Sequence, residues 1–137
     1  MSETVFQKII SGDILAAVVY ESDTTFAFLD HNPTHKGHTL VIPKKPVVDI
    51  FTLTDPEAGD LMRTIVRVAN AVQKATGAPG VNIISNNGVE AGQEVLHLHF
   101  HVVPRFDKEE FRPLPRTTYA NDEEQFEFAK KISEALQ

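Results

Sequence analysis

The chain contains no cysteine among its 137 residues, which excludes disulfide bonds and metal sites built from thiolates. It has no apolar stretch long enough to span a bilayer, and its first residues lack the basic region and long apolar run of a secretory signal. The formal net charge of −6 argues against the basic surface on which general affinity for nucleic acid depends. We therefore expect a cytoplasmic protein that binds neither membranes nor nucleic acid.

The composition is otherwise that of an ordinary globular protein, with 42% hydrophobic and 23% charged residues. A length of 137 residues predicts a single domain that can bury a core without disulfides or a structural metal ion. Five segments have the β-branched and aromatic bias of strands. They are residues 16–22, 24–30, 38–45, 81–85 and 94–103.

One long helix is predicted to begin after Thr54, because Thr54 and Glu57 have the spacing of a capping box. Its apolar stripe consists of Leu61, Met62, Ile65, Val68, Ala69 and Val72. Shorter helices are predicted at residues 5–11 and near the C-terminus, and the apolar stripe of the last helix consists of Phe128, Ile132 and Leu136. Strands linked mostly as hairpins, with helices inserted as blocks, favour an α+β fold around an antiparallel sheet.

Three of the six histidines stand at every second position in the segment EVLHLHFHVVPR, residues 94–105. In a strand, His97, His99 and His101 would share one face at intervals of roughly 7 Å. The apolar residues between them would point into the core, and these are Leu96, Leu98, Phe100 and Val102. The row is therefore expected to be a polar face backed by a hydrophobic one.

Such a row can serve as a catalytic device, a metal site or a plain solvated face. Solvated strand faces usually carry Lys, Glu, Thr and Ser, so three imidazoles are an unusual choice. Imidazole is a common zinc ligand, but three side chains from one flat strand converge poorly on an ion. Catalysis is the interpretation that we favour, with a metal site second and a solvated face third.

The segment HLHFHVV, residues 97–103, resembles the His-φ-His-φ-His-φ-φ signature of the histidine triad (HIT) superfamily. Residues 28–45 resemble the first nucleotide-contacting segment of that family, and NNGVEAGQEV, residues 86–95, resembles its phosphate loop. The combination is much more specific than the triad alone. Similar proteins hydrolyse or transfer nucleoside monophosphates joined to a phosphate, an amine or another leaving group.

The resemblance also implies a fold and an assembly. We expect a HIT-like fold, with a five-stranded antiparallel sheet, one long helix, a short N-terminal helix and a C-terminal helix. Residues 1–137 would form a single HIT domain, with a core over about 4–105 and a C-terminal extension over 106–137. Members of the family are homodimers whose sheets join edge to edge, and they need no cofactor.

Histidine suits this chemistry, because a side chain with an unperturbed pKa of about 6.5 is largely neutral at pH 7 and offers a free lone pair. The resemblance assigns His99 as the nucleophile that attacks the α-phosphorus and carries the nucleotidyl group. Its other ring nitrogen needs an acceptor, and a nearby backbone carbonyl is the economical choice. His101 would donate to the phosphate or leaving group, while His97 and His38 would orient the row. His35 is expected to be solvent-exposed.

Asp30 and His31 follow a predicted strand and match the ribose-binding positions of the family. On its own, Asp30 is equally typical of a turn. The resemblance implies instead that its carboxylate accepts hydrogen bonds from both ribose hydroxyls, with His31 beside the sugar. Phe6, Ile9 and Phe28 correspond to the apolar walls of the base pocket, a role that is compatible with core packing.

The loop NNGVEAGQE is longer than a tight hairpin needs, which favours a function for it. Gly88 and Gly92 would let the backbone approach an anion, whose oxygens N–H groups can bind. The resemblance places Asn86 at the sugar and bridging oxygen, and Gln93 and Glu94 beside the phosphate. Known relatives carry serine or threonine at the position of Glu94. A carboxylate at this position would repel a phosphate. The backbone N–H of Glu94 is therefore the more useful group.

Some bacterial relatives hold a structural zinc ion with Cys-x-x-Cys near the N-terminus, where this chain has Thr4 and Gln7. We therefore predict a fold without zinc. The expected function is cleavage of purine nucleoside 5′-phosphoramidates, or related aminoacyl adenylates, through a His99–nucleotide intermediate. The alternatives are a dinucleoside polyphosphate hydrolase, a nucleotide-binding adaptor with incidental turnover, and a metal-dependent hydrolase.

Overall fold

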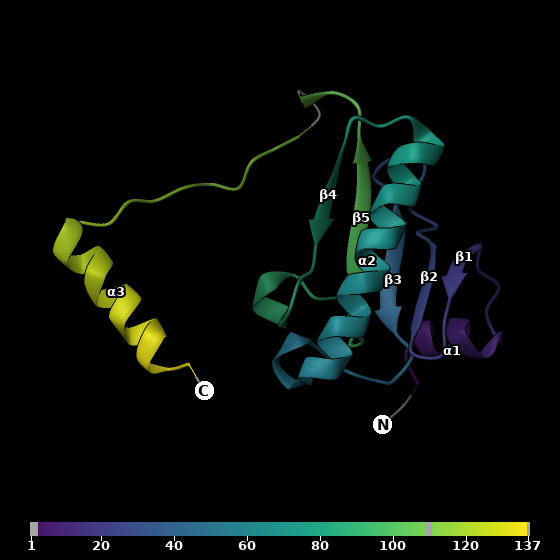
Figure 1. Ribbon diagram of the computed structural model, residues 1–137, viewed down its shortest axis with the longest axis horizontal. Helices are drawn as coiled ribbons and strands as arrows, with labels where there is room; N and C mark the ends of the chain where they lie inside the picture. The colour runs from purple at the N-terminus through teal and green to yellow at the C-terminus, as the bar shows by residue number, and fades with distance from the viewer. Residues whose placement is uncertain (1–2, 109–110, 137) are drawn as a thin grey trace.

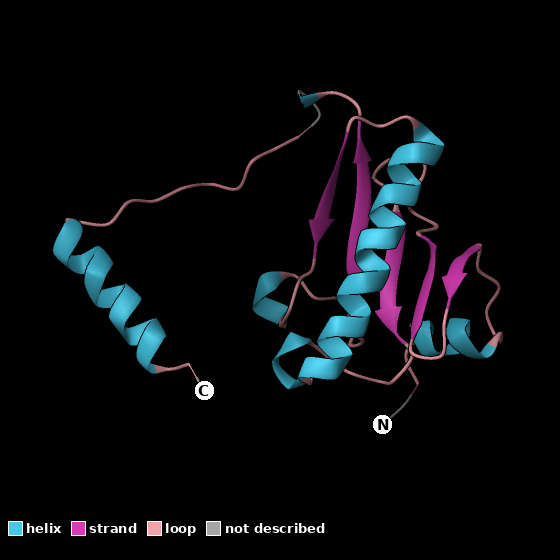
Figure 2. Ribbon diagram, in the orientation of Figure 1, coloured by secondary structure: helices cyan, strands magenta, loops and turns pink. Residues whose placement is uncertain are grey.

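The protein, seen in a computed structural model that describes residues 3–108 and 111–136, is built on one five-stranded antiparallel sheet (Figures 1 and 2). The strand order is β1-β2-β3-β5-β4. The strands are β1 (Val18–Glu21), β2 (Thr25–Leu29), β3 (Thr39–Pro43), β4 (Gly80–Ile84) and β5 (Phe100–Arg105). The helices are α1 (Val5–Ser11), α2 (Asp55–Thr76) and α3 (Asp122–Glu134), with short 3-10 turns η1 (Ile50–Thr52) and η2 (Val89–Ala91). The predicted α+β fold is confirmed.

Helix α2 begins directly after Thr54, as the capping-box spacing predicts. The Thr54 hydroxyl accepts from the Glu57 backbone N–H and the Glu57 carboxylate accepts from the Thr54 N–H, which closes the capping box. The helix ends at Gly77 in the left-handed conformation. Its apolar stripe packs on one face of the sheet in a core formed by Ala27, Val41, Val47, Leu61, Ile65, Val68, Val72, Leu98 and Val102. Met62, predicted for this stripe, is instead exposed.

The opposite face of the sheet is covered in part by α1. Thr4 and Gln7 form its capping box, in which the Gln7 backbone N–H donates to the Thr4 hydroxyl and the Thr4 N–H donates to the Gln7 side chain. These are the two positions at which the family resemblance would place zinc ligands. Helix α1 buries Phe6 in a second core cluster, formed with Phe26, Phe28, Leu40 and Ile42. The histidines lie on this second face, because His101 pairs with Leu40.

The prediction of a strand over residues 94–103 is wrong for the first part of that range, because β5 begins only at Phe100. The antiparallel register that pairs Val41 with Phe100 would place Pro43 opposite Leu98. Proline has no N–H to donate to a ladder, and β3 ends at that residue. Residues 94–99 therefore run as an irregular segment, and only His101 of the three histidines lies in a strand. Leu96, expected in the core, is 55% exposed.

The C-terminal segment extends away from the rest of the chain. Residues 111–120 are exposed and have no regular structure, and α3 follows them, standing clear of the sheet and of α2 (Figure 1). The Asn121 side chain, directly before α3, caps the first turn of the helix by accepting a hydrogen bond from the Glu124 backbone N–H. The predicted helix is present, but none of its described residues is buried. Among the described residues, no helix combines the length and apolar character that crossing a membrane requires.

Candidate active site

His99 is held with one ring nitrogen bound and the other available. Its Nδ1 lies 2.7 Å from the backbone carbonyl oxygen of His97. A carbonyl oxygen only accepts, so Nδ1 carries the proton and Nε2 carries the lone pair. The Phe6 ring packs edge-on against the imidazole, with ring centroids 5.0 Å apart. The residue is only 8% exposed, so packing and hydrogen bonding together fix the direction of the Nε2 lone pair.

His97 is the most deeply buried of the row, at 1% exposed. Its Nε2 donates to the carbonyl oxygen of Pro43 over 2.8 Å, which joins the irregular segment to the end of β3. Its Nδ1 has no hydrogen-bond partner in the described part of the chain. Burial lowers the pKa of His97, against a smaller raising effect from the Pro43 carbonyl. The ring is therefore neutral near pH 7, and its role in this arrangement is to brace the segment.

A hydrogen-bonded chain fixes the tautomers of His38 and His101. The backbone N–H of Thr34 donates to His38 Nδ1 over 3.0 Å, so the proton of a neutral His38 is on Nε2. That Nε2–H donates to His101 Nδ1, 2.9 Å away. Since Nδ1 of His101 accepts, its own proton is on Nε2. One backbone amide in the loop before β3 thus sets the tautomer of a histidine on β5.

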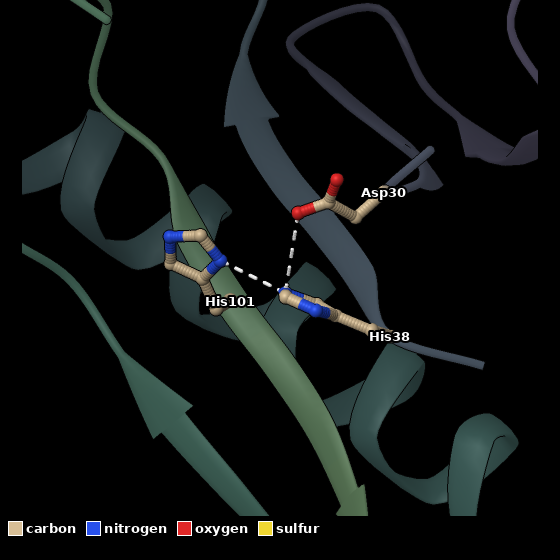
Figure 3. Close-up of side chains that lie close together, drawn as sticks. All are labelled: Asp30, His38 and His101. Atoms are coloured by element: carbon tan, nitrogen blue, oxygen red, sulfur yellow. Dashed lines mark hydrogen bonds and ion pairs between the residues drawn. The ribbon is translucent and has the colours of Figure 1, made fainter. Parts of the chain in front are cut away.

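The Asp30 carboxylate lies beside this chain, as Figure 3 shows. Its Oδ2 is 3.6 Å from His38 Nε2, while its Oδ1 accepts from the Asn32 backbone N–H over 2.9 Å. The second contact is the Asx turn that is typical of an aspartate at this position. Asp30 therefore serves the turn with one oxygen and keeps the other beside the imidazoles.

The pKa values of His38 and His101 are both lowered. For His38 the largest cause is burial, which the nearby Asp30 opposes and Arg105 reinforces. Burial, followed by the neighbouring His99 and His38, lowers the pKa of His101 to about 4, against the raising effect of Asp30. Both rings are therefore neutral near pH 7 in the absence of a ligand.

Asp30, His38 and His101 are a group of potential metal ligands, with one ligand atom from each within 4.8 Å of the others. The donor set does not fit an ion in the arrangement seen here. His38 Nδ1 already accepts the Thr34 N–H, so binding a metal ion through Nε2 would require both nitrogens to act as acceptors. A neutral imidazole has only one acceptor nitrogen. The group therefore functions as a hydrogen-bonded chain and not as a cation site.

The predicted phosphate loop, residues 86–95, is held by Gln93. The Gln93 side chain accepts from the Gly88 N–H and donates to the carbonyl oxygens of Val48 and Val95. The residue is buried, so it braces the loop and offers little surface to a ligand. Glu94 is exposed. Asn86 is half-buried beside Gly92, whose φ of 92° suits a residue without a side chain.

The backbone of the histidine segment is also braced by residues that the sequence did not single out. The Ser85 hydroxyl donates to the carbonyl oxygen of His99 over 2.9 Å, and the Asn87 side chain donates to that hydroxyl. The Ile50 N–H in turn donates to Asn87. Ser85 directly precedes the NNG turn, but its residue type alone gives no signal for this contact. Thr34 acts through its backbone and is invisible to any analysis of residue types.

The remaining predicted residues lie around the row, with differing access to a ligand. Phe6 and Phe28 are buried in the second core cluster, and Ile9 packs against it while half-buried. Ile9 is thus the one of the three with surface to offer a base. His31 is exposed. His35, expected to be solvent-exposed, is instead half-buried with its ring centroid 4.6 Å from that of Phe106.

The lowered pKa of His101 predicts acid sensitivity of the fold. In the unfolded chain a histidine takes up a proton near pH 6.5, whereas His101 in the folded protein does so only near pH 4. Between these values the unfolded state binds more protons, so stability falls as the pH falls. We expect His101 to contribute about 2 kcal/mol to this loss once partial solvent access is allowed for. Urea unfolding from pH 7 to pH 4 measures it.

The matched variant for this experiment is His101→Gln, which removes the titrating group and retains an acceptor for His38. Its free energy of unfolding is expected to fall less steeply with decreasing pH than that of the wild type. Parallel profiles for the two proteins would contradict the assignment.

Three comparisons with known proteins bear on this site. A family model described as the HIT domain matches residues 11–108. Protein hit of Bacillus subtilis is 40% identical over 118 residues, which cover 86% of this chain and 81% of that protein. Adenosine 5′-monophosphoramidase hnt1 of Schizosaccharomyces pombe is 39% identical over 105 residues, covering 77% of this chain and 76% of that protein. A crystal structure of a HIT family member from Bacillus subtilis has a TM-score of 0.90 at 36% identity over 99% of both chains.

Proposed function

Since this chain belongs to the HIT family of nucleotide hydrolases and transferases, we propose that it cleaves purine nucleoside 5′-phosphoramidates and related nucleotidyl conjugates at the α-phosphorus. The reaction proceeds through a covalent intermediate on His99. The similarity to a protein named as an adenosine 5′-monophosphoramidase supports this substrate class. The observation that carries the proposal is the hydrogen bond from His99 Nδ1 to the His97 carbonyl, because it leaves Nε2 free for attack.

In the first step, the lone pair of His99 Nε2 forms a bond to the α-phosphorus. The bond from phosphorus to the leaving group breaks, and its electron pair departs with the amine. In the second step, water attacks phosphorus and gives up a proton to His101, which is neutral after the first step. The P–Nε2 bond breaks with its electron pair returning to Nε2, which releases the nucleoside monophosphate and restores the imidazole. One difficult displacement is thereby divided into two easier ones.

His101 delivers the proton that the departing amine requires. Its Nε2–H is oriented by the acceptance of the His38 proton at Nδ1, so it is the donor on this side of the row. The free protein keeps His101 neutral. A bound phosphate brings negative charge next to the ring and raises its pKa, because a nearby opposite charge favours the protonated form. Substrate binding therefore creates the acid that the first step uses.

The other predicted residues bind the nucleotide in this proposal. Asp30 Oδ2 accepts from the ribose hydroxyls, with His31 beside the sugar, and the exposed part of Ile9 contacts the base. In the loop, the N–H groups of Gly88, Ala91, Gly92 and Gln93 already donate within the loop. The backbone N–H of Glu94 is thus the loop donor assigned to the phosphate, with the carboxylate turned to solvent. Asn86 contacts the bridging oxygen.

We also propose that the protein is a homodimer in which two sheets meet at β4. Strand β4 ends the sheet and pairs only with β5 in the described structure. Exposed apolar side chains lie on it and on the neighbouring α2, and these are Ile83, Ile84, Met62 and Val66. An edge strand with exposed apolar neighbours is suited to pairing with a second copy.

The substrate class is tested by assaying an adenosine 5′-phosphoramidate and a diadenosine polyphosphate at equal concentration. We expect kcat/KM for the phosphoramidate to exceed that for the polyphosphate by at least about tenfold, because His101 supplies the proton that an amine leaving group needs and a phosphate leaving group does not. The reverse ratio would assign the protein to the polyphosphate hydrolases. Binding of both ligands without turnover of either would assign it to the nucleotide-binding adaptors.

A further inference from the structure

The C-terminal helix α3 presents an apolar stripe that stays largely exposed, although the Tyr119 ring packs against Phe128 with ring centroids 5.9 Å apart. Phe128 and Ile132 are spaced four residues apart and so lie along one side of the helix, and Leu136 follows at the same spacing just beyond the last helical residue, Glu134. Ile132 is 65% exposed and Leu136 is 76% exposed. The opposite side carries Glu127, Lys130 and Glu134, with Lys130 and Glu134 in an ion pair at 4.0 Å. The helix is therefore amphipathic, and its apolar side is exposed.

A helix of this length is marginal on its own. Isolated helices of about 12–15 residues are only partly formed in water, and most helices in proteins are stabilised by packing of an apolar face. Helix α3 has 13 residues. The segment before it contains Pro113 and Pro115 and is extended, and proline-rich segments are stiff spacers. In the structure, α3 stands clear of the body of its own chain (Figure 1).

The similarity to a solved relative extends over the arm and α3. Residues 106–108 and 111–136, the described part of the arm and α3, are 29 of the 137 residues. Each residue contributes at most an equal share to a TM-score. A relative in which the arm pointed elsewhere would therefore score well below the observed 0.90 over 99% of both chains. From residue 111 onward, every described residue except the half-buried Glu124 is exposed, so burial against its own chain does not fix the direction of α3. A contact with another molecule can supply the burial that the chain itself lacks.

We propose that α3 docks, through Phe128, Ile132 and Leu136, onto the body of a second copy of this chain, so that two copies exchange their C-terminal arms. Helix α3 lies beyond β4, on the side of the free sheet edge (Figure 1). A second copy joined at that edge would occupy the space between β4 and α3. The arm is thereby continuous with the interface proposed above, and the second copy is the occupant that this position favours.

The first test compares two full-length variants that differ only in the side of α3 that they alter. One replaces Phe128, Ile132 and Leu136 by serine, and the control replaces Glu127, Lys130 and Glu134 by serine. We expect the stripe variant to raise the dimer dissociation constant on the order of 100-fold, and the control to leave it within about threefold. Sedimentation equilibrium measures both constants. Equal constants for the two variants, or a wild type that is still monomeric at about 100 μM, would overturn the proposal.

The second test shows whether the contact runs between chains. Because the chain has no cysteine, Lys130→Cys carries a nitroxide at one defined place on the polar side of α3. This nitroxide-labelled protein, at natural nitrogen isotope abundance, is mixed with ¹⁵N-labelled wild type, and the two proteins are allowed to exchange subunits. We expect broadening of amide signals from the body of the ¹⁵N chain, and loss of that broadening when the nitroxide chain also carries the three stripe serines. Broadening that survives the stripe serines, or none in the mixture, would contradict arm exchange.

Discussion

Replacing His99 by asparagine is expected to reduce kcat by at least roughly 10⁴-fold on a phosphoramidate substrate. The His99 Nε2 carries a lone pair with no fixed partner, since Nδ1 is committed to the His97 carbonyl. The other unpartnered nitrogen of the row, His97 Nδ1, is buried and out of reach of a substrate. An asparagine amide can still donate to that carbonyl, so the local fold is retained while the nucleophile is lost. Single-turnover kinetics with saturating substrate measures the effect.

Two controls separate loss of chemistry from loss of the site. His99→Asn should bind adenosine monophosphate within about tenfold of wild type, because the groups assigned to the base, ribose and phosphate are unchanged. His35→Asn removes a histidine that stacks on Phe106 outside the row, and it should retain kcat within about threefold. Turnover that survives in His99→Asn would mean that water attacks the phosphorus directly.

Replacing His101 by glutamine is expected to slow release of an amine leaving group by about 10²–10⁴-fold. Glutamine can accept from His38 and donate to a phosphate oxygen, but it cannot transfer a proton. The loss should shrink to less than about tenfold for a nucleoside 5′-phosphate nitrophenyl ester, whose leaving group departs without protonation. The measurement is the rate of leaving-group release in the first turnover, which reports the first step alone.

Equal losses for the two leaving groups would give a different conclusion. They would show that His101 acts by binding or orienting the phosphate in both reactions, and that the proton comes from another group. The comparison depends on the chain from Thr34 through His38 to His101, because that chain is what places a proton on His101 Nε2.

The elements that the sequence predicted well are those with local signals. Helix α2 has a capping box at its start, glycine at its end and a stripe of apolar residues between them, so its limits follow from neighbours in the chain. Met62 was assigned to the wrong side because one residue of helix turns a side chain by about 100°. The stripe of α3 was equally readable, but no local signal shows where its apolar side finds a partner.

The histidine segment shows where such signals fail. Alternation of polar and apolar residues from Glu94 to Val103 is typical of a strand, yet a strand also needs a neighbour that supplies a ladder. That neighbour is β3, which ends at Pro43, 54 residues away from His97 in sequence. The alternation still placed Leu98 and Val102 in the core, so the interpretation was correct for the sides of the chain and wrong for its hydrogen bonding.

The sequence named side chains that the structure brings together, but it did not show the backbone groups that support them. The sequence and the family resemblance indicated His38, and the structure brings it within hydrogen-bonding distance of His101. The groups that fix the tautomers are the backbone N–H of Thr34 and the backbone carbonyl of His97. Every residue carries such groups, so only a folded chain shows which of them meet an imidazole.

Covalent catalysis by His99 is tested most directly by isolating the intermediate on the wild-type protein. Reaction with an adenosine 5′-phosphoramidate is stopped in alkali within one turnover, which preserves a bond between phosphorus and histidine. Peptide mass spectrometry and phosphorus NMR then locate the nucleotidyl group. The covalent mechanism predicts a single adduct on His99, joined through Nε2. Rapid turnover without an adduct, or an adduct on any other residue, would contradict it.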